Sequence, residues 1–347
     1  MTTEKTIKYF SMFSGIGGFE YGIEKADTQT DFECVGYSEI DKYAVSIYEK
    51  NYPNHTNYGD ATKINTKDLP NFSFLVGGFP CQAFSLAGKR KGFEDTRGTL
   101  FFEIARVLQE KRPQYFLLEN VRGLLSHDQG KTFQTILGVL ADLGYYVQWT
   151  VLNSKNFGVP QNRERIFIEG YLRAECGLEV LSIRRNCEAN NDRQLIKLNN
   201  KPQAQSVYDA NGVACTLSAN GGGQGGKTGL YKINKVGNLT VGNLSRTGHH
   251  GGDVVSTHGI TRTLCSTDYK RGVKIIEDSN TKKVENTSDL KIRRLTPKEC
   301  ERLQGFPDNW TKYGKDGELI SDTQRYKCCG NAVTTNVIAA IIGEMFP

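Results

Sequence analysis

One cysteine of the chain lies in a setting suited to nucleophilic chemistry. Cys81 follows Gly77-Gly78-Phe79-Pro80 just after a short apolar run, where a rigid turn open to solvent is expected. A reactive thiol needs that exposure and a lowered pKa. A lone cysteine is more often a small buried hydrophobic residue, so Cys81 alone decides nothing.

Polar residues that could assist a nucleophile stand beside two other apolar runs. Glu119 and Asn120 follow the run 114–118, and Gln161-Asn162-Arg163-Glu164-Arg165 leads into the run 165–169. A carboxyl group in such a place could hold or transfer a proton, and the two arginines could hold an anion or a carbonyl group. Each feature also has a plain alternative, a helix cap for Glu119 and solvated charge for Arg163 and Arg165.

A glycine-rich turn follows the first apolar run, in the sequence Phe13-Ser14-Gly15-Ile16-Gly17-Gly18-Phe19-Glu20. Such a turn lets a nucleotide-like ligand approach backbone N–H groups. The dinucleotide pattern G-x-G-x-x-G is broken because position 20 is Glu. Glu39 ends the second run and is placed to bind ribose hydroxyls, and Asp60 precedes the third. The set predicts an adenosyl-containing cofactor other than NAD.

The elements that must position these residues alternate over the first 170 residues. Strands are predicted at 7–12, 33–37, 72–76, 114–118, 145–152 and 165–169, and helices at 19–25, 43–51, 100–111 and 131–143. Further helices are predicted at 295–304 and 332–346. This alternation indicates an α/β fold with a doubly wound, mostly parallel sheet. Ligands bind such sheets in loops at the carboxyl ends of the strands, which is where the candidates of the first, second, third and fourth strands lie; Arg163 and Arg165 come in the loop before the sixth strand.

Residues 175–290 have a different texture. Helical periodicity is lost, and 13 of the 37 glycines fall between Gly212 and Gly259. The segment 175–294 holds 18 basic and 11 acidic residues, a charge of +7, whereas the whole chain carries +6. Segments 207–220 and 254–267 also resemble each other, which a duplicated hairpin would explain. We expect short strands joined by turns, with a basic surface for a polyanion or merely a solvated one.

The composition excludes several classes of protein. Hydrophobic residues make up 38% and charged residues 24% of 347 residues, which suits a folded core rather than a disordered chain. No apolar run reaches the ~18 residues of a membrane span, and no signal peptide is visible. Nine cysteines without a CxxC pair fit neither a disulfide framework nor a structural metal site. We expect a cytoplasmic protein without a metal.

The motifs in combination resemble the C5 cytosine-specific DNA methyltransferases, and 78–106 resembles the small bacterial HhaI-type enzymes. The order is Phe-x-Gly-x-Gly-Gly, Pro-Cys-Gln, Glu-Asn-Val and Gln-x-Arg-x-Arg, then residues 294–300 and a closing Gly330-Asn331-Ala332-Val333. The resemblance implies a Rossmann-like domain over 1–174 plus 311–347, with the C-terminal helix packed back on it. A smaller, glycine-rich, mostly β target-recognition domain would span 175–310.

By this resemblance Cys81 would add to C6 of a cytosine flipped out of the duplex, and Glu119 would contact N3. Arg165 would hold O2, Arg163 would support the site, and C5 would take the methyl group of S-adenosylmethionine, leaving S-adenosylhomocysteine. Cofactor contacts are expected at Phe13, Gly15, Gly17, Gly18, Glu39, Asp60, Pro80, Leu100 and Asn331. DNA contacts are expected at Gln82, Ser85, Lys89, Arg97, Gly221, Gly222 and Gly223. Ile40 stands where the family often has a stacking Trp.

The partner implied is double-stranded DNA, methylated by a monomer in a restriction–modification system with its cognate endonuclease, or by an orphan or phage-borne enzyme. Two alternatives remain at this stage. A tRNA cytosine-C5 methyltransferase would use the same chemistry, but the long basic segment favours DNA. A catalytically idle DNA-binding protein would not need Cys81, Glu119, Arg163 and Arg165 together.

Overall fold

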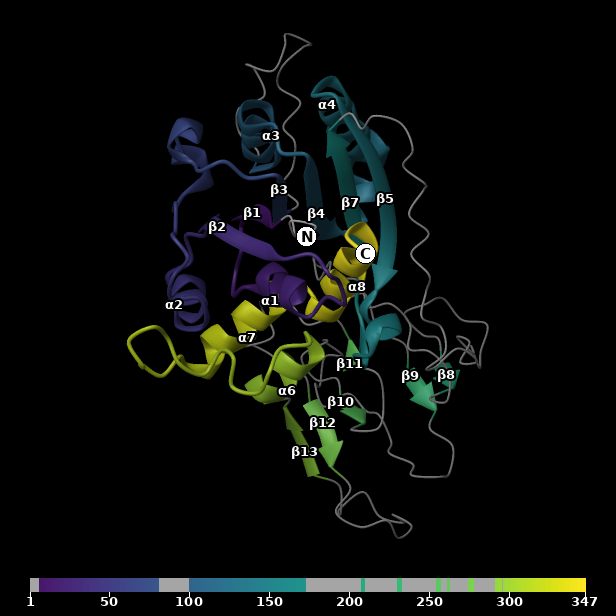
Figure 1. Ribbon diagram of the computed structural model, residues 1–347. Helices are drawn as coiled ribbons and strands as arrows, with labels where there is room; N and C mark the ends of the chain where they lie inside the picture. The colour runs from purple at the N-terminus through teal and green to yellow at the C-terminus, as the bar shows by residue number, and fades with distance from the viewer. Residues whose placement is uncertain are drawn as a thin grey trace.

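The computed structural model describes residues 6–80, 100–172 and 296–347, together with short strands at 207–209, 230–232, 254–256, 261–262, 274–277 and 291–294. A sheet with helices on both faces forms the larger part, and the short strands gather beyond one end of it (Figure 1). Within these residues no helix is long and apolar enough to cross a membrane.

The large sheet has the order β2-β1-β3-β4-β7-β5. Its strands are β1 (Ile7–Met12), β2 (Phe32–Ser38), β3 (Phe74–Gly78), β4 (Tyr115–Val121), β5 (Tyr145–Asn153) and β7 (Glu164–Leu172). Neighbouring strands from β2 to β4 are parallel, and β7 runs antiparallel to both β4 and β5. The predicted α/β class with a mostly parallel sheet is confirmed.

The reversed direction of β7 matters for the site. Arg165 of β7 pairs with Val121 of β4, and Gly78 of β3 pairs with Glu119. The beginning of β7 therefore lies at the same edge of the sheet as the carboxyl ends of β3 and β4. That geometry brings the Arg-containing motif to the Glu-containing motif, although 44 residues of sequence separate Val121 from Arg165.

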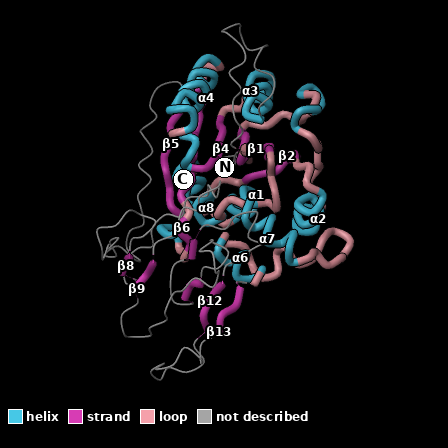
Figure 2. The backbone as a smooth tube through the Cα atoms, turned by 180° about the vertical axis from the view of Figure 1, so that it is seen from behind, coloured by secondary structure: helices cyan, strands magenta, loops and turns pink. Residues whose placement is uncertain are grey.

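Two apolar layers cover the sheet (Figure 2). On one face α3 (Leu100–Lys111) and α4 (Lys131–Asp142) pack on side chains such as Phe10 and Leu118. On the other face α1 (Gly18–Glu24) and α8 (Thr335–Met345) pack on Phe74 and Phe167. Helix α2 (Lys42–Asn51) follows β2 and packs against the chain near Phe306. Burial on both faces accounts for the near-continuous apolar strands.

The C-terminal part begins with α6 (Pro297–Leu303), followed by α7 (Asp322–Asn331). Thr296 forms a capping box with Glu299 at the start of α6, where Pro297 occupies the first turn. Gln304 Nε2 donates to the Cys329 carbonyl, and Trp310 Nε1 donates to the Ile16 carbonyl. The predicted domain boundary at 310 stays a prediction, but these contacts favour a boundary before α6.

Short strands represent the central segment among the described residues. They are β8 (Val207–Asp209), β9 (Leu230–Lys232), β10 (Val254–Ser256), β11 (Thr261–Arg262), β12 (Lys274–Glu277) and β13 (Lys291–Arg294). Strand β11 pairs with β6 (Gln161–Asn162), which joins this segment to the loop that precedes Arg163.

The two similar segments of the sequence do begin with equivalent strands, β8 and β10. Each of these strands pairs in parallel, β8 with β9 and β10 with β12. Neither pairing is that of a hairpin, whose neighbouring strands are antiparallel, and the duplicated hairpin stays a prediction. The remainder of both segments lies outside the described residues apart from β11.

Candidate active site

The glycine turn after β1 takes its shape from left-handed backbone conformations. The φ angles are 55° at Phe13, 56° at Gly15 and 86° at Gly17. A Cβ atom on Gly17 would lie 2.7 Å from the Tyr52 ring, and one on Gly18 would lie 2.7 Å from Val333 Cγ1. At Gly15 a Cβ atom would meet nothing within 4 Å. The turn is therefore closed beneath Gly17 and Gly18 and open beside Gly15.

Glu39 ties this turn to the end of β2. Its Oε2 atom accepts a hydrogen bond of 2.9 Å from the Gly15 N–H. Its Oε1 atom accepts from the N–H groups of Ile40 and Asp41, at 2.8 and 2.9 Å. A carboxylate oxygen has two acceptor sites, so Glu39 retains capacity for a ligand hydroxyl. The Ile40 side chain beside it is 71% exposed, a large apolar surface next to the turn.

Asp60 lies at the same edge because the chain from 57 to 59 runs beside the end of β2. Tyr37 forms a bridge with Asn57, and Ser38 Oγ donates to the Gly59 carbonyl. Asp60 Oδ1 accepts from the backbone and hydroxyl of Thr62, and these bonds lower the pKa of its carboxyl group. Phe13, Gly15, Glu39 and Asp60 are thus brought together, as predicted from their order on the strands.

Other predicted cofactor residues border this region. Pro80 is exposed two residues after the end of β3, and the half-buried Leu100 opens α3. Asn331 is exposed at the end of α7, two residues before the Val333 that contacts Gly18. These three residues lie on elements next to the glycine turn, and their part in binding a cofactor stays a prediction.

Glu119 and Arg165 form an ion pair at the neighbouring part of the sheet edge. Arg165 Nε lies 2.9 Å from Glu119 Oε1, and the two side chains are only 15% and 12% exposed. A Cβ atom on Gly78 of β3 would lie 3.3 Å from Glu119 Oε2. Among the described residues Arg165 is the polar partner of Glu119, so Oε2 remains available. The arrangement can present a carboxyl group and a guanidinium group to one small planar ligand.

Asn120, the residue after Glu119, fixes the chain that leads to Cys81. Its Nδ2 atom donates a hydrogen bond of 2.8 Å to the carbonyl of Phe79, and the side chain is 1% exposed. No role was predicted for Asn120 from the sequence. Its place next to Glu119 at the end of β4 was the available signal, because adjacent residues at a strand end can contact the two neighbouring strands.

Arg163 is buried rather than directed to the open edge. Its guanidinium group donates to the carbonyls of Gly330 and Ala332, at 3.3 and 2.8 Å, and its backbone N–H donates to Asn153 Oδ1. Arg163 therefore links β7 to the end of α7. The expectation that it supports the site fits this position, and a direct part in the chemistry stays a prediction.

The remaining predicted residues lie outside the described part of the chain. They are Cys81, Gln82, Ser85, Lys89, Arg97, Gly221, Gly222 and Gly223. Among the described residues no group of three or more His, Cys, Asp or Glu side chains is arranged to hold a metal ion.

Comparison with known proteins agrees with this geometry. The family model for C-5 cytosine-specific DNA methylase matches residues 7–347. The chain belongs to this family, and it is a DNA (cytosine-5)-methyltransferase. Its reaction requires a methyl donor. The resemblance stated from the motifs is confirmed, and DNA is supported as the substrate over tRNA.

Two curated relatives and one solved structure illustrate the family. The Type II methyltransferase M1.ScrFI of Lactococcus lactis subsp. cremoris is 40% identical, over 98% of this chain and 79% of the relative. The orphan methyltransferase M.Rho11sI of Bacillus phage rho11s is 32% identical, over 98% and 97%. The Dnmt2 methyltransferase of S. pombe has a TM-score of 0.67 with 20% identity and 97% coverage of both chains, which shows the shared fold.

Proposed function

We propose that the chain binds S-adenosylmethionine at the carboxyl ends of β1, β2 and β3. The residues present fit this group: space is open beside Gly15, Glu39 has free acceptor capacity, and the exposed Ile40 offers an apolar surface for a base. Asp60 would take an amine or base nitrogen. When bound, the cofactor supplies an electrophilic methyl group, and S-adenosylhomocysteine is the product that leaves.

The chain's own residues activate the cytosine. The Cys81 thiolate would add to C6 of the base, which makes C5 nucleophilic. Glu119 would protonate or hydrogen-bond N3, and Arg165 would hold the O2 carbonyl, so that negative charge does not accumulate on the ring. After C5 has gained the methyl group, loss of the C5 proton expels the thiolate and restores the aromatic ring.

The Glu119–Arg165 pair is the observation that carries this proposal. Arg165 Nε lies 2.9 Å from Glu119 Oε1 at the sheet edge, next to β3. Asn120 holds the carbonyl of Phe79, two residues before Cys81 in the sequence. These contacts support the proposal that an acid and a carbonyl-binding cation act at the edge to which the chain leads through Phe79 and Pro80 before Cys81. Arg163 would position β7, because it fastens the beginning of that strand to the end of α7.

Access to the base requires that the cytosine leave the duplex, at a cost of a few kcal/mol. We propose that Ser85–Gly98, with Gln82, Lys89 and Arg97, closes over the DNA and neutralises phosphates. The segment 175–295, including Gly221–Gly223, would read the bases. The protein would act as a cytoplasmic monomer, either with a cognate endonuclease or as an orphan enzyme.

Bisulfite sequencing of plasmid DNA from cells expressing the chain tests this function. We expect one cytosine of one short motif to be methylated, and we expect a soluble Cys81→Ala variant to leave the same site unmethylated. An unmethylated plasmid with well-expressed wild-type protein, or equal methylation by Cys81→Ala, would contradict the proposal.

A further inference from the structure

A fully buried carboxyl group lies beneath the glycine turn and has no part in the mechanism above. Glu20, in the first turn of α1, is 0% exposed, and neither of its carboxylate oxygens has a hydrogen-bond partner among the described residues. The same holds for the buried hydroxyl groups of Ser11 on β1 and Tyr52 after α2. Buried polar atoms without partners are rare in folded proteins, and three residues with such atoms gather here around one turn.

The groups that face Glu20 are acidic or neutral. They are Tyr9 and Ser11 of β1, Glu24 of α1, Cys34 and Tyr37 of β2, Tyr48 of α2 and Tyr52. His55 is hydrogen-bonded to the Tyr48 hydroxyl at 3.0 Å, and burial lowers its pKa. Within the described residues no lysine or arginine pairs with Glu20. Burial raises the pKa of Glu20 to about 7, although the Ser11 and Tyr48 hydroxyls, which lie near the carboxyl group without forming a well-aligned hydrogen bond to it, oppose the shift.

The same cluster supports the turn that would receive the cofactor. The Tyr52 ring lies directly under Gly17, so close that a Cβ atom there would be 2.7 Å away. Tyr52 also contacts Trp310, whose indole N–H donates to the Ile16 carbonyl at 2.9 Å. A displacement of Tyr52 would therefore move Ile16 and Gly17. Glu20 begins three residues after Gly17 on the same short helix.

We propose that Glu20 is a positioning residue for the cofactor turn, which holds the binding conformation of Ile16-Gly17 while its carboxyl group is neutral. Ionisation would place a charge without a counter-ion among Tyr9, Tyr48 and Tyr52, and the cluster would open to solvate it. The turn would then shift with Tyr52. Cofactor affinity should accordingly fall as the pH rises past neutrality, an inference that rests on the proposed cofactor.

Calorimetric titration with S-adenosylhomocysteine between pH 6 and 9 tests this proposal, and it needs neither DNA nor turnover. The variants are Glu20→Gln, which mimics the neutral carboxyl group, and Glu169→Gln as the matched control. Glu169 of β7 is also buried, and burial likewise raises its pKa to about 7, but it lies beside Glu344 rather than the turn. Titration of the ligand's own groups changes the Kd of all three proteins by the same factor. The ratio of the Kd values of wild type and Glu20→Gln at each pH therefore reports the effect of Glu20.

We expect Glu20→Gln to match the wild type at pH 6 and to bind at least about tenfold more tightly than the wild type at pH 9. Glu169→Gln should follow the wild type throughout. A constant ratio between wild type and Glu20→Gln, or the same change in Glu169→Gln, would overturn the proposal. Failure of the wild type to bind at any pH would overturn the cofactor assignment and this inference together.

A second measurement covers the case in which Glu20→Gln does not fold. In Glu169→Gln protein labelled with carboxyl-¹³C glutamate, one resonance should titrate near pH 7, and its midpoint should rise when S-adenosylhomocysteine binds. An unchanged midpoint would overturn the proposal without any substitution at position 20.

Discussion

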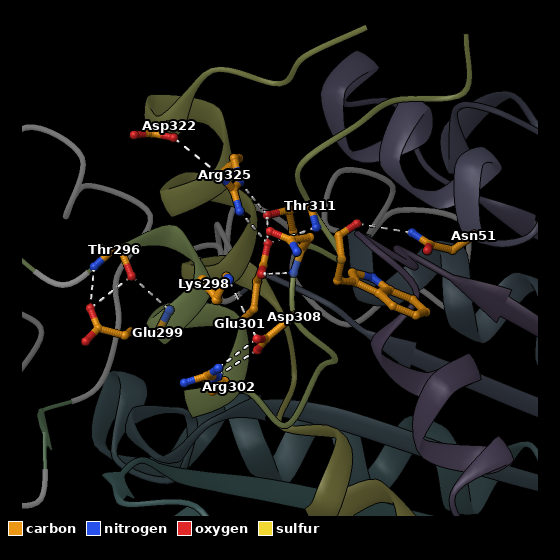
Figure 3. Close-up of polar contacts among 12 residues, drawn as sticks. Asn51, Thr296, Lys298, Glu299, Glu301, Arg302, Asp308, Thr311, Asp322 and Arg325 are labelled. Atoms are coloured by element: carbon orange, nitrogen blue, oxygen red, sulfur yellow. Dashed lines mark hydrogen bonds and ion pairs between the residues drawn. The ribbon is translucent and has the colours of Figure 1, made fainter. Parts of the chain in front are cut away.

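Two buried glutamate–arginine pairs lie in different regions of the molecule, and they differ in how far the carboxylate is satisfied. In the C-terminal part, Glu301 of α6 pairs with Arg325 of α7 at 2.9 Å (Figure 3). Glu301 also accepts from the Asn309 N–H, the Thr311 N–H and the Thr311 hydroxyl. At the sheet edge, Glu119 has Arg165 alone among the described residues.

This difference distinguishes a structural ion pair, Glu301–Arg325, from the pair to which we assign a chemical role, Glu119–Arg165. Glu301 is 0% exposed and accepts four hydrogen bonds, three at Oε1 and one at Oε2, so it is closed to a ligand from solvent and instead joins α6, the loop at 309–311 and α7. The Glu119 side chain is 12% exposed and keeps an oxygen without a partner among the described residues. Burial of an ion pair therefore does not by itself indicate a catalytic site; the unused acceptor capacity of Glu119 beside Arg165 is what supports the proposed role.

The largest expected effect is that of Glu119→Gln on activity. Loss of the proton donor at N3 should reduce the methylation rate about 10²–10⁴-fold, the range typical of general acid–base groups. The melting temperature should stay close to that of the wild type, because the amide has the same shape. Tritium transfer from labelled S-adenosylmethionine to DNA measures the rate, and full activity of the variant would contradict the assignment.

Glu301→Ala should lower the stability of the protein and leave its methylation activity intact. Removal of Glu301 takes away the buried partner of Arg325 and leaves it the exposed Asp322, 3.5 Å away, which costs up to about 3–5 kcal/mol. We expect a melting temperature lower by roughly 10 °C in calorimetry, because a large domain loses about 2–4 °C per kcal/mol. Methylation per folded molecule at low temperature should be retained. If Glu301→Ala were inactive but fully stable, the contrast between the two pairs would be wrong.

A buried carboxyl group without an arginine partner, such as Glu169, should make the free energy of unfolding depend on pH. Burial raises the pKa of Glu169 to about 7 from an ordinary 4.5, so the native state binds the proton more tightly than the unfolded state. The neutral Glu169 carboxyl group should therefore contribute about 3 kcal/mol to the free energy of unfolding below about pH 4.5. This contribution should decrease as the pH rises and be lost above about pH 7. Denaturant unfolding from pH 4.5 to 8 should show a smaller decline for Glu169→Gln. An identical decline would mean that Glu169 is ionised in the native protein.

Gly78→Ala should give the smallest effect. Its Cβ atom would lie 3.3 Å from Glu119 Oε2, so the carboxyl group must shift by a few tenths of an ångström. Misplacement on that scale should lower the rate by about tenfold without unfolding the protein. Gly138→Ala in α4 is the matched control, since a Cβ atom there meets nothing within 4 Å. Equal rates for both variants would show that Glu119 tolerates the shift.

Much of the sheet could be predicted from the sequence because its strands are short, apolar and bounded by turns. β1 matches the predicted range 7–12, and the other strands of the large sheet agree to within a few residues. Helix α7 was not predicted, because its sequence DTQRYKCCGN is mostly polar and its buried residues, such as Arg325 and Cys329, do not form an obvious apolar stripe. The predicted closing helix starts at Thr335 rather than Ala332, since Ala332 is extended.

The candidate site, like the fold, could be predicted from the sequence only in part. The order of motifs placed Gly15 beside Glu39, because carboxyl ends of parallel strands meet at one edge. Glu119 lies beside Arg165 for another reason: β7 is antiparallel to β4, so the beginning of β7 meets the carboxyl end of β4. What the sequence alone did not show depends on contacts between distant segments: Asn120 with Phe79, and Arg163 with the end of α7. Glu20 entered our sequence analysis only as a break in a dinucleotide pattern. Its burial follows from packing that no local pattern records.

The central claim, that Cys81 attacks a base which Glu119 and Arg165 hold, can be tested by trapping the adduct. Duplex DNA carrying 5-fluorocytosine at the mapped target retains its C5 substituent, so a thiolate added at C6 cannot be expelled after methyl transfer. Incubation with S-adenosylmethionine, denaturing electrophoresis and peptide mass spectrometry identify the attached residue. The account predicts a denaturant-stable complex through Cys81, absent in Cys81→Ala and much slower to form in Glu119→Gln. Attachment at another residue, or an equal yield with Cys81→Ala, would contradict it.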